Sequence, residues 1–391
     1  MSEVSSNNDT ARISRAILLA RSLLKKGGAL ESTASGESID RTKLTLALEE
    51  QIRSQLSHNA EQPAITAKAA AAEGLLNAEN ALNKTAQGAS PANLTELEVA
   101  SLEAIIEITG RPAMRYENGK VGMPPSALGE NDRWRVLIAT ARNDINVASS
   151  AVGRIMITGS SGIPENIGSG WRLGQDLVVT NRHVGLLMVK KPDSSPLDLT
   201  LDEARHPLID FSATDNATAT KRFDIAALVY CAVEEFVDVA ILKVTSGLAD
   251  FPAALTLDWN PDSLGSKRED SNGAEPEFSG KEVYVVGHPF KQRRSSAIAA
   301  VFGTADGLKR WSPGLVKRIH ANEPILDHDC STLGGNSGSC VLSAEGHAVV
   351  GIHMGGFEVD ELTDRGLANA AVAFSYLGQQ PAAEILRTGI V

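Results

Sequence analysis

Ser337 stands in a cluster of small residues, GGNSGS at 334–339, and such a cluster is either an ordinary tight turn or the loop of a nucleophile. A serine hydroxyl becomes a useful nucleophile only when a base, usually histidine, removes its proton, and a carboxylate commonly orients that base. The chain offers a histidine, His183, after the β-rich run LVVTNR, and an aspartate, Asp238, at the head of the run VAILKV. We therefore predict that His183, Asp238 and Ser337 form a nucleophilic site.

The elements that must position these residues fall into two halves with different periodicity. Residues 1–110 are predicted to be helical, as a small bundle or an array of helical hairpins. Apolar residues recur at helical spacing over 13–24 and 44–56, and an alanine-rich segment of high helix propensity covers 64–84. Thr95 and Glu98 have the spacing of a capping box, and the helix that it opens ends at Gly110, before Pro112.

Residues 111–149 are predicted to form a junction, and the sequence pattern of residues 150–391 is typical of a β domain. In the junction, the Asn-Gly pair of the run YENGKV favours a tight hairpin turn, and a further helix is expected around 134–145. After the junction, short β-rich runs alternate with Gly, Pro and Asp turns, which is typical of a sandwich or a barrel. The polar segment 260–281 is predicted to be an exposed loop between strands.

The bulk composition limits the classes of function. The 391 residues carry a formal net charge of −11, which argues against a general nucleic-acid binder, because such proteins neutralise phosphates with lysine and arginine. The three cysteines, Cys231, Cys330 and Cys340, are too few for a disulfide framework and favour a reducing compartment. No apolar run reaches the roughly 20 residues of a membrane span, and the N-terminus lacks an uninterrupted signal-peptide core. We therefore predict a cytoplasmic protein that does not bind membranes.

The sequence contains no motif that requires a metal or a cofactor. The histidines are scattered, no HExxH motif occurs, and the cysteines have no paired spacing. His328 and Asp329 beside Cys330 suggest at most a weak ligand cluster. The chain also lacks a GxxxxGK phosphate loop, so nucleotide-driven chemistry is not expected. We predict a reaction that uses neither metal nor cofactor.

The motifs TNRHV, DVAILKV, GGNSGS and GIHMGG, in that order, resemble those of the trypsin-like (chymotrypsin-fold) serine peptidases, especially their bacterial branch. The order His183, Asp238, Ser337 is also that of the chymotrypsin-type enzymes and differs from that of subtilisins and α/β-hydrolases. The resemblance covers residues from about 150 to 385. It implies an all-β, chymotrypsin-like fold of two antiparallel β-barrels, each of six strands, preceded by the α-helical N-terminal domain.

The resemblance implies a role for each motif residue. His183 would be general base and then general acid, Asp238 would hold its tautomer, and Ser337 would attack the carbonyl carbon. The backbone N–H groups of Gly335 and Ser337 would form the oxyanion hole. Asp224, in the similar run FDIAAL, competes with Asp238. We favour Asp238, because DVAILKV is the closer match to the family and Asp224 would leave the long strand after it unexplained.

The residues before the nucleophile bear on substrate preference. Ser331 stands six residues before Ser337, where relatives selective for arginine or lysine carry aspartate, so basic selectivity is not expected. Thr332 and His353 are similar to pocket residues of bacterial glutamyl endopeptidases, which implies a preference for acidic or small residues before the cut. The alternative is that His353 is a strand residue whose ring is bonded internally.

Together these features predict an intracellular serine endopeptidase that hydrolyses protein substrates through an acyl-enzyme. The helical region is large and lies directly before the barrels, so it is expected to dock a regulatory partner or to restrain the active site. Two alternatives stay open. One is a catalytically silent barrel that serves as a binding module. The other is a protein-quality-control peptidase whose main work is to bind unfolded chains.

Overall fold

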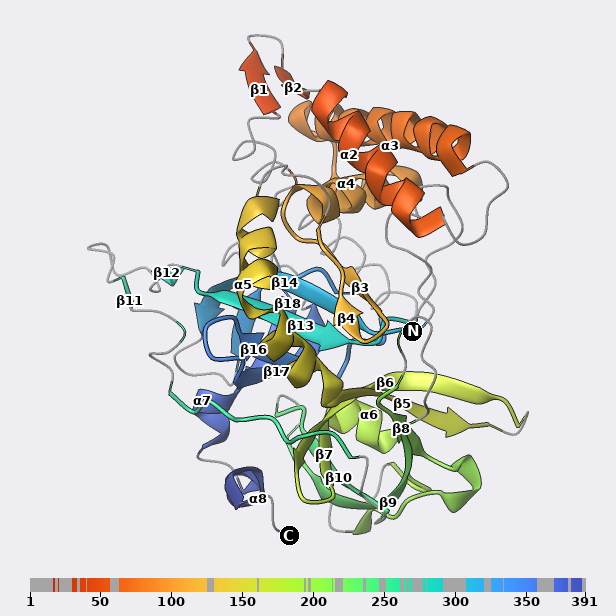
Figure 1. Ribbon diagram of the computed structural model, residues 1–391, viewed down its shortest axis with the longest axis vertical. Coiled ribbons are helices and arrows are strands. Elements are labelled where there is room, and N and C mark those ends of the chain that lie inside the picture. The colour runs from red at the N-terminus through yellow and green to blue at the C-terminus, as the bar shows by residue number, and fades with distance from the viewer. Residues whose placement is uncertain are drawn as a thin grey trace.

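The computed structural model describes residues 17, 20, 30–33, 36–39, 41–56, 63–124, 130–159, 162–192, 195, 198–212, 214, 221–234, 237–245, 251–260, 264, 267–268, 277–278, 280–290, 307–319, 325–332, 334–356, 369–378 and 381–388. In this part of the chain, a helical region lies at one end of the long axis, one β-barrel lies at the other end, and another β-barrel lies between them (Figure 1). Most of the helical stripe expected over 13–24 lies outside the described residues.

The helical region contains the elements β1 (Leu30–Thr33), β2 (Gly36–Ile39), α2 (Arg41–Leu56), α3 (Pro63–Ala86), η1 (Pro91–Asn93) and α4 (Glu96–Thr109). Its three helices share a core of alanine, leucine and isoleucine side chains. The predicted capping box opens α4: Thr95 Oγ1 accepts a hydrogen bond from the Glu98 N–H (3.2 Å), and Glu98 Oε2 accepts one from the Thr95 N–H (2.8 Å). The sequence did not predict the hairpin of β1 and β2.

The junction consists of β3 (Met114–Glu117), β4 (Lys120–Val121) and α5 (Asn131–Ser150). The predicted hairpin turn is present, and its Asn118 and Gly119 both have positive φ, as such tight turns require. Strand β3 adds to the second barrel, because Met114 pairs with Trp311. Trp134 of α5 is fully buried in the same core cluster as Trp311. The junction therefore packs on the second barrel, although the first barrel follows it in the chain.

The first barrel is built from β5 (Val152–Thr158), β6 (Pro164–Gly174), β7 (Leu177–Thr180), β8 (Leu208–Asp210), β9 (Arg222–Cys231) and β10 (Ala240–Val244). The six strands close in the order β10-β7-β6-β5-β8-β9, and all neighbours are antiparallel. The short helix α6 (Arg182–Leu186) follows β7, and the turn η3 (Glu203–Arg205) precedes β8. Closure leaves no free strand edge in this barrel.

The second barrel is built from β13 (Glu282–Gly287), β14 (Arg310–Ile319), β15 (Ile325–His328), β16 (Cys340–Ser343), β17 (Val349–Gly356) and β18 (Asn369–Ala373). The strands run in the order β13-β16-β17-β18-β15-β14, and the pairing of β13 with β14 closes the ring. The helices α7 (Phe374–Leu377) and α8 (Ala382–Thr388) follow, and the strands β11 (Lys267–Arg268) and β12 (Glu277–Phe278) pair within the polar segment expected to be a loop.

The two closed, six-stranded antiparallel barrels confirm the predicted fold class. One core cluster spans both barrels and α5, and three of its tryptophans, Trp134, Trp171 and Trp311, are fully buried. The barrels are therefore packed on one another through a shared apolar core. Within the described residues, no helix combines the length and the apolar character needed to cross a membrane.

Candidate active site

Strands β7 and β10 of the first barrel position the histidine and the aspartate. Their antiparallel register places Ala240 opposite Thr180, so the residues just before β10 meet those just after β7. His183 lies in the first turn of α6, and its Nδ1 is 2.7 Å from Asp238 Oδ2. The other carboxylate oxygen, Asp238 Oδ1, accepts a hydrogen bond from the backbone N–H of His183 (2.9 Å).

Asp238 fixes the imidazole in position and in tautomer. The N–H of His183 belongs to the first helical turn, where backbone donors lack an intrahelical acceptor, and Asp238 satisfies it. Asn181, directly before α6, donates from its side chain to the carbonyl oxygen of Asp238 (2.9 Å), so the two segments are tied again. With Nδ1–H donated to the carboxylate, Nε2 is free to accept a proton. The His183 side chain is 47% exposed, which leaves it accessible to a substrate.

Asp224, the competing aspartate, lies on another part of the first barrel. It pairs with Leu208 in the ladder between β8 and β9, and its side chain is exposed. Its carbonyl oxygen accepts a hydrogen bond from the N–H of Thr245 (2.9 Å). The carboxylate that contacts His183 is that of Asp238.

Ser337 lies in the loop that joins β15 to β16, and the peptide before it has a defined orientation. The N–H of Phe290 donates to the carbonyl oxygen of Gly334 (3.0 Å). Because the peptide bond is trans, the N–H of Gly335 points away from Phe290. Gly335 has a φ of +105°, and a Cβ there would overlap the Phe290 ring and lie 2.7 Å from His288 O. This orientation of the Gly335 N–H requires glycine.

Ser169, on β6 of the first barrel, is hydrogen-bonded to residues 334–339 of the second barrel, which we call the serine loop. Its N–H donates to Ser337 O (2.8 Å), and its hydroxyl donates to Gly335 O (2.9 Å). The same hydroxyl accepts a hydrogen bond from the His288 N–H (3.0 Å). Ser169 is fully buried. No sequence pattern singled out Ser169, which lies in the run GSGW at 168–171.

The segments that carry His183 and Ser337 meet at β6. A Cβ on Gly168 would lie within 2.9 Å of both methyl groups of Val184, the residue after His183, and 3.1 Å from Ser337 O. A Cβ on Gly338 would overlap atoms of Ser169 and Thr180. The serine loop is therefore in close contact with the end of β7 and the start of α6, where the His183–Asp238 pair is formed.

A second histidine, His288, also lies against the serine loop. It is fully buried, and its Nδ1 is 3.0 Å from Gly307 O. Burial, together with the positive charge of Lys309, lowers the pKa of His288 to about 3. His288 is therefore a very weak base near neutral pH and is not suited to accept a proton from the serine loop.

Of the residues expected to line the specificity pocket, Thr332 precedes the serine loop, and His353 lies on β17, which pairs with the strand that follows the loop. Thr332 is half-buried before the loop. His353 is buried in β17, its Nδ1 is 3.2 Å from His328 Nε2, and its N–H donates to Ser339 O (2.8 Å). Ser331 donates from its hydroxyl to the carbonyl oxygen of Arg111 (2.6 Å). The His353 ring is thus bonded to a second histidine through its Nδ1.

The side chains of His328 and Asp329, which the sequence suggested as possible metal ligands beside Cys330, contact other protein groups instead. Asp329 accepts hydrogen bonds from Arg111, and His328 contacts His353. In the part of the chain that the structure describes, no group of three or more His, Cys, Asp or Glu side chains is arranged to hold a metal ion. The three cysteines are buried and unpaired, and burial raises the pKa of the Cys330 and Cys340 thiols. These thiols stay protonated and are poor nucleophiles.

Residues 168–352 match the family model of the trypsin-like peptidase domain. Among solved structures, the chain is similar to a serine endoprotease from Yersinia pestis, with 18% identity over 63% of this chain and 68% of that chain and a TM-score of 0.37. It is also similar to a protease from M. tuberculosis in its active form, with 16% identity over 63% of this chain and 86% of that chain and a TM-score of 0.38. No curated protein matches the chain significantly in sequence.

The matched segment runs from β6 to β17 and therefore includes parts of both barrels. It contains His183, Asp238 and Ser337. Residues 168–352 are therefore identified as a trypsin-like peptidase domain, and the two closed barrels have the fold expected of it.

Proposed function

We propose that this chain is an endopeptidase that cleaves protein substrates through an acyl-enzyme, with His183, Asp238 and Ser337 as its catalytic residues. The observation that carries the proposal is the hydrogen bond between His183 Nδ1 and Asp238 Oδ2 (2.7 Å), beside a serine loop that is anchored to the neighbouring strand β6. The pair supplies an oriented base, and the loop supplies a hydroxyl and backbone donors.

The reaction follows from these groups. Ser337 Oγ attacks the scissile carbonyl carbon while its proton passes to His183 Nε2, and Asp238 stabilises the imidazolium that forms. His183 then gives the proton to the leaving amine, the C–N bond breaks, and an ester links the acyl group to Ser337. A water molecule, deprotonated by His183, attacks the ester. The proton returns to Ser337 Oγ as the acid product leaves.

The developing oxyanion is stabilised by backbone donors. The N–H groups of Gly335 and Ser337 are the proposed oxyanion hole, and the hydrogen bond from Phe290 to Gly334 O supports the required peptide orientation. Such donors cost no reorganisation during the reaction, because the loop holds them in place beforehand. Loss of one donor in an oxyanion hole typically lowers kcat by about 100- to 1000-fold.

We extend the proposal to substrate choice and to cellular context. The Thr332 hydroxyl and the His353 imidazole would favour an acidic or small residue before the cut, and cleavage of a peptide library that is equal after Glu and Leu would exclude this preference. The three unpaired, buried cysteines support a reducing compartment such as the cytoplasm. The helical region would serve as a docking site for a regulatory partner.

Covalent labelling tests the proposed nucleophile. A fluorophosphonate probe is expected to label the wild-type protein at one site, and Ser337→Ala is expected to abolish labelling and the hydrolysis of protein substrates. Ser343→Ala is the matched control, because Ser343 lies on β16 outside the loop. A wild-type protein that remains unlabelled and inactive would instead favour a silent barrel that only binds.

A further inference from the structure

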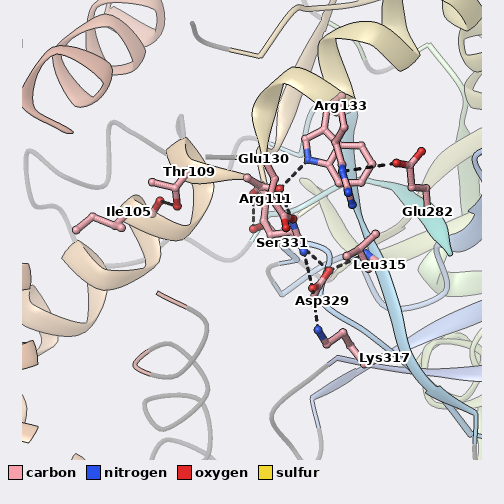
Figure 2. Close-up of polar contacts among 12 residues, drawn as sticks. Ile105, Thr109, Arg111, Glu130, Arg133, Glu282, Leu315, Lys317, Asp329 and Ser331 are labelled. Carbon is pink, nitrogen blue, oxygen red and sulfur yellow. Dashed lines mark hydrogen bonds and ion pairs between the residues drawn. The ribbon is translucent and has the colours of Figure 1, made fainter. Parts of the chain in front are cut away.

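Arg111, the second residue after α4, is a buried arginine between the helical region and the second barrel. Its side chain is 1% exposed, and Figure 2 shows it among contacts from both parts. Guanidinium Nε and Nη2 donate to the two carboxylate oxygens of Asp329 (2.6 and 2.7 Å). Nη1 donates to Glu130 Oε2 and to Gly110 O, both at 2.6 Å. All three guanidinium nitrogens therefore have partners in fixed directions.

Asp329 is held from the side of the second barrel as well. The N–H of Leu315 in β14 donates to its Oδ1 (2.7 Å), and Lys317 Nζ lies 3.7 Å from its Oδ2. Burial alone would raise the pKa of this carboxyl, but the charge and hydrogen bonds of Arg111 outweigh burial and hold the pKa below its usual value. Asp329 is thus an ionised, buried carboxylate whose position depends on Arg111.

The same arginine also holds the residues that follow Asp329. Ser331 Oγ donates to the carbonyl oxygen of Arg111 (2.6 Å), and Asn369 Nδ2 of β18 donates to Cys330 O (2.7 Å). The segment 329–332, which we call the pocket wall, is therefore fixed by the junction on one side and by β18 on the other. It ends at Thr332, a proposed pocket residue, and the serine loop begins two residues later.

On its other side, Arg111 is tied to the end of α4 and the start of α5. Gly110 O accepts a hydrogen bond from Trp134 Nε1 (2.7 Å) as well as from Arg111. The N–H of Glu130 donates to Thr109 O (2.8 Å), and Asn131 Nδ2 donates to Ile108 O (2.6 Å). A shift of α4 relative to the barrels would therefore move the Arg111 backbone and guanidinium together.

We propose that Arg111 is a positioning residue through which the helical region sets the geometry of the pocket wall and hence the choice of substrate. The inference rests on the proposed function, because it takes Thr332 as a pocket residue. It also gives the helical region a physical route to the active site. A protein partner that binds the helices and moves α4 would change which side chain the pocket accepts.

The test compares two lysine variants of the full-length protein. Arg111→Lys keeps the charge but cannot donate to both oxygens of Asp329 in parallel. The matched control is Arg133→Lys, because Arg133 also joins the junction to the second barrel, through Glu282 at 3.6 Å, but both of these side chains are about 40% exposed (Figure 2).

We expect Arg111→Lys to lower kcat/KM for peptide substrates by roughly 10- to 100-fold, because a small displacement of a binding wall misplaces the substrate. The rate at which diisopropyl fluorophosphate labels Ser337 should change less than about threefold, because this reagent is too small to be positioned by the pocket wall. Hydrogen exchange over 325–332 should become faster. Arg133→Lys should leave all three measurements unchanged.

A double variant, Arg111→Met with Asp329→Leu, guards against simple unfolding, since removal of both buried charges is often tolerated where removal of one is not. We expect it to remain folded with low kcat/KM and normal labelling. Equal losses of kcat/KM and labelling, unchanged hydrogen exchange in Arg111→Lys, or full kcat/KM in the double variant would each overturn the inference. Failure of the proposed function differs from these results, because wild-type protein would then show neither labelling nor cleavage.

Discussion

The two barrels hold their parts of the site in different ways. In the first barrel, His183 follows β7 and Asp238 precedes β10. These two strands are paired, and their ladder brings the two residues together. In the second barrel, Ser337 lies in a loop whose carbonyl groups are held by residues from elsewhere: Ser169 of the first barrel and Phe290 after β13. The junction residue Arg111 holds the segment before that loop.

The difference has a simple cause. Strand register is specified along the whole ladder, since a slip by one residue would turn the buried side chains of the strand outward. A loop of small residues has no such ladder and little side-chain packing of its own. Its conformation must be fixed by hydrogen bonds from surrounding elements. The proposed base is thus positioned by the fold of one barrel, whereas the position of the proposed nucleophile depends on several parts of the molecule.

The largest effect is expected at the His183–Asp238 pair, which the first barrel alone holds in place. Asp238→Asn should lower kcat by about 10⁴-fold near neutral pH, because an amide favours the wrong tautomer of His183 while the serine loop stays intact. Asp224→Asn is the matched control and should retain normal activity, since its exposed side chain lies on another strand. Steady-state hydrolysis of a peptide ester measures both. A reversed ranking of the two variants would mean that the wrong aspartate was assigned.

A smaller effect is expected at Ser169, through which the first barrel supports the serine loop of the second barrel. Ser169→Ala removes the hydroxyl that donates to Gly335 O and accepts from the His288 N–H, so the serine loop loses one of the hydrogen bonds that hold it. We expect kcat to fall by roughly 10- to 100-fold, with little change in KM. The NMR signal of the His183 Nδ1 proton, which reports its hydrogen bond to Asp238, should stay the same, because Ser169 does not contribute to that bond.

Ser150→Ala is the control for that experiment, since Ser150 is an exposed serine whose hydroxyl bonds only within α5. Equal activities of Ser169→Ala and wild type would show that the serine loop keeps its shape without support from the first barrel. That result would remove the contrast between the two barrels.

The smallest effect concerns a buried lysine at the contact of the two barrels. Lys309 Nζ donates to Ser149 O (2.8 Å) and to Phe211 O of the first barrel (3.2 Å), and burial lowers its pKa from 10.5 to about 7. At pH values between about 7 and 10.5, this lysine is protonated in the unfolded chain but largely neutral in the folded chain, so the unfolded chain binds more protons. The lysine therefore destabilises the fold most below about pH 7, and this penalty shrinks as the pH rises.

Urea unfolding from pH 6 to pH 10 can measure this contribution. The free energy of unfolding of wild type minus that of Lys309→Met should rise by about 2–4 kcal/mol across the range. Parallel curves for wild type and Lys309→Met would show that Lys309 keeps its proton in the folded state.

Much of the architecture was predictable from local patterns. The capping box at Thr95, the Asn-Gly hairpin and the change from helical to β texture are all signals that lie within a few residues of sequence, and the structure contains each of them. The β1–β2 hairpin was missed, as was the addition of β3 to β14, because a strand of four residues carries almost no periodic signal. The assigned roles of the site residues stay predictions until the variants are measured.

The sequence by itself determined the order of the motifs, the residue types that can transfer a proton, and the small residues that a crowded loop requires. Only the tertiary structure decided which groups fix that loop. Ser169 and Gly335 are 166 residues apart in the chain, and Arg111 and Asp329 are 218 apart. Such contacts have no local pattern, because a single hydrogen bond or ion pair between distant segments is created by the packing of the barrels and not by any periodicity along the chain.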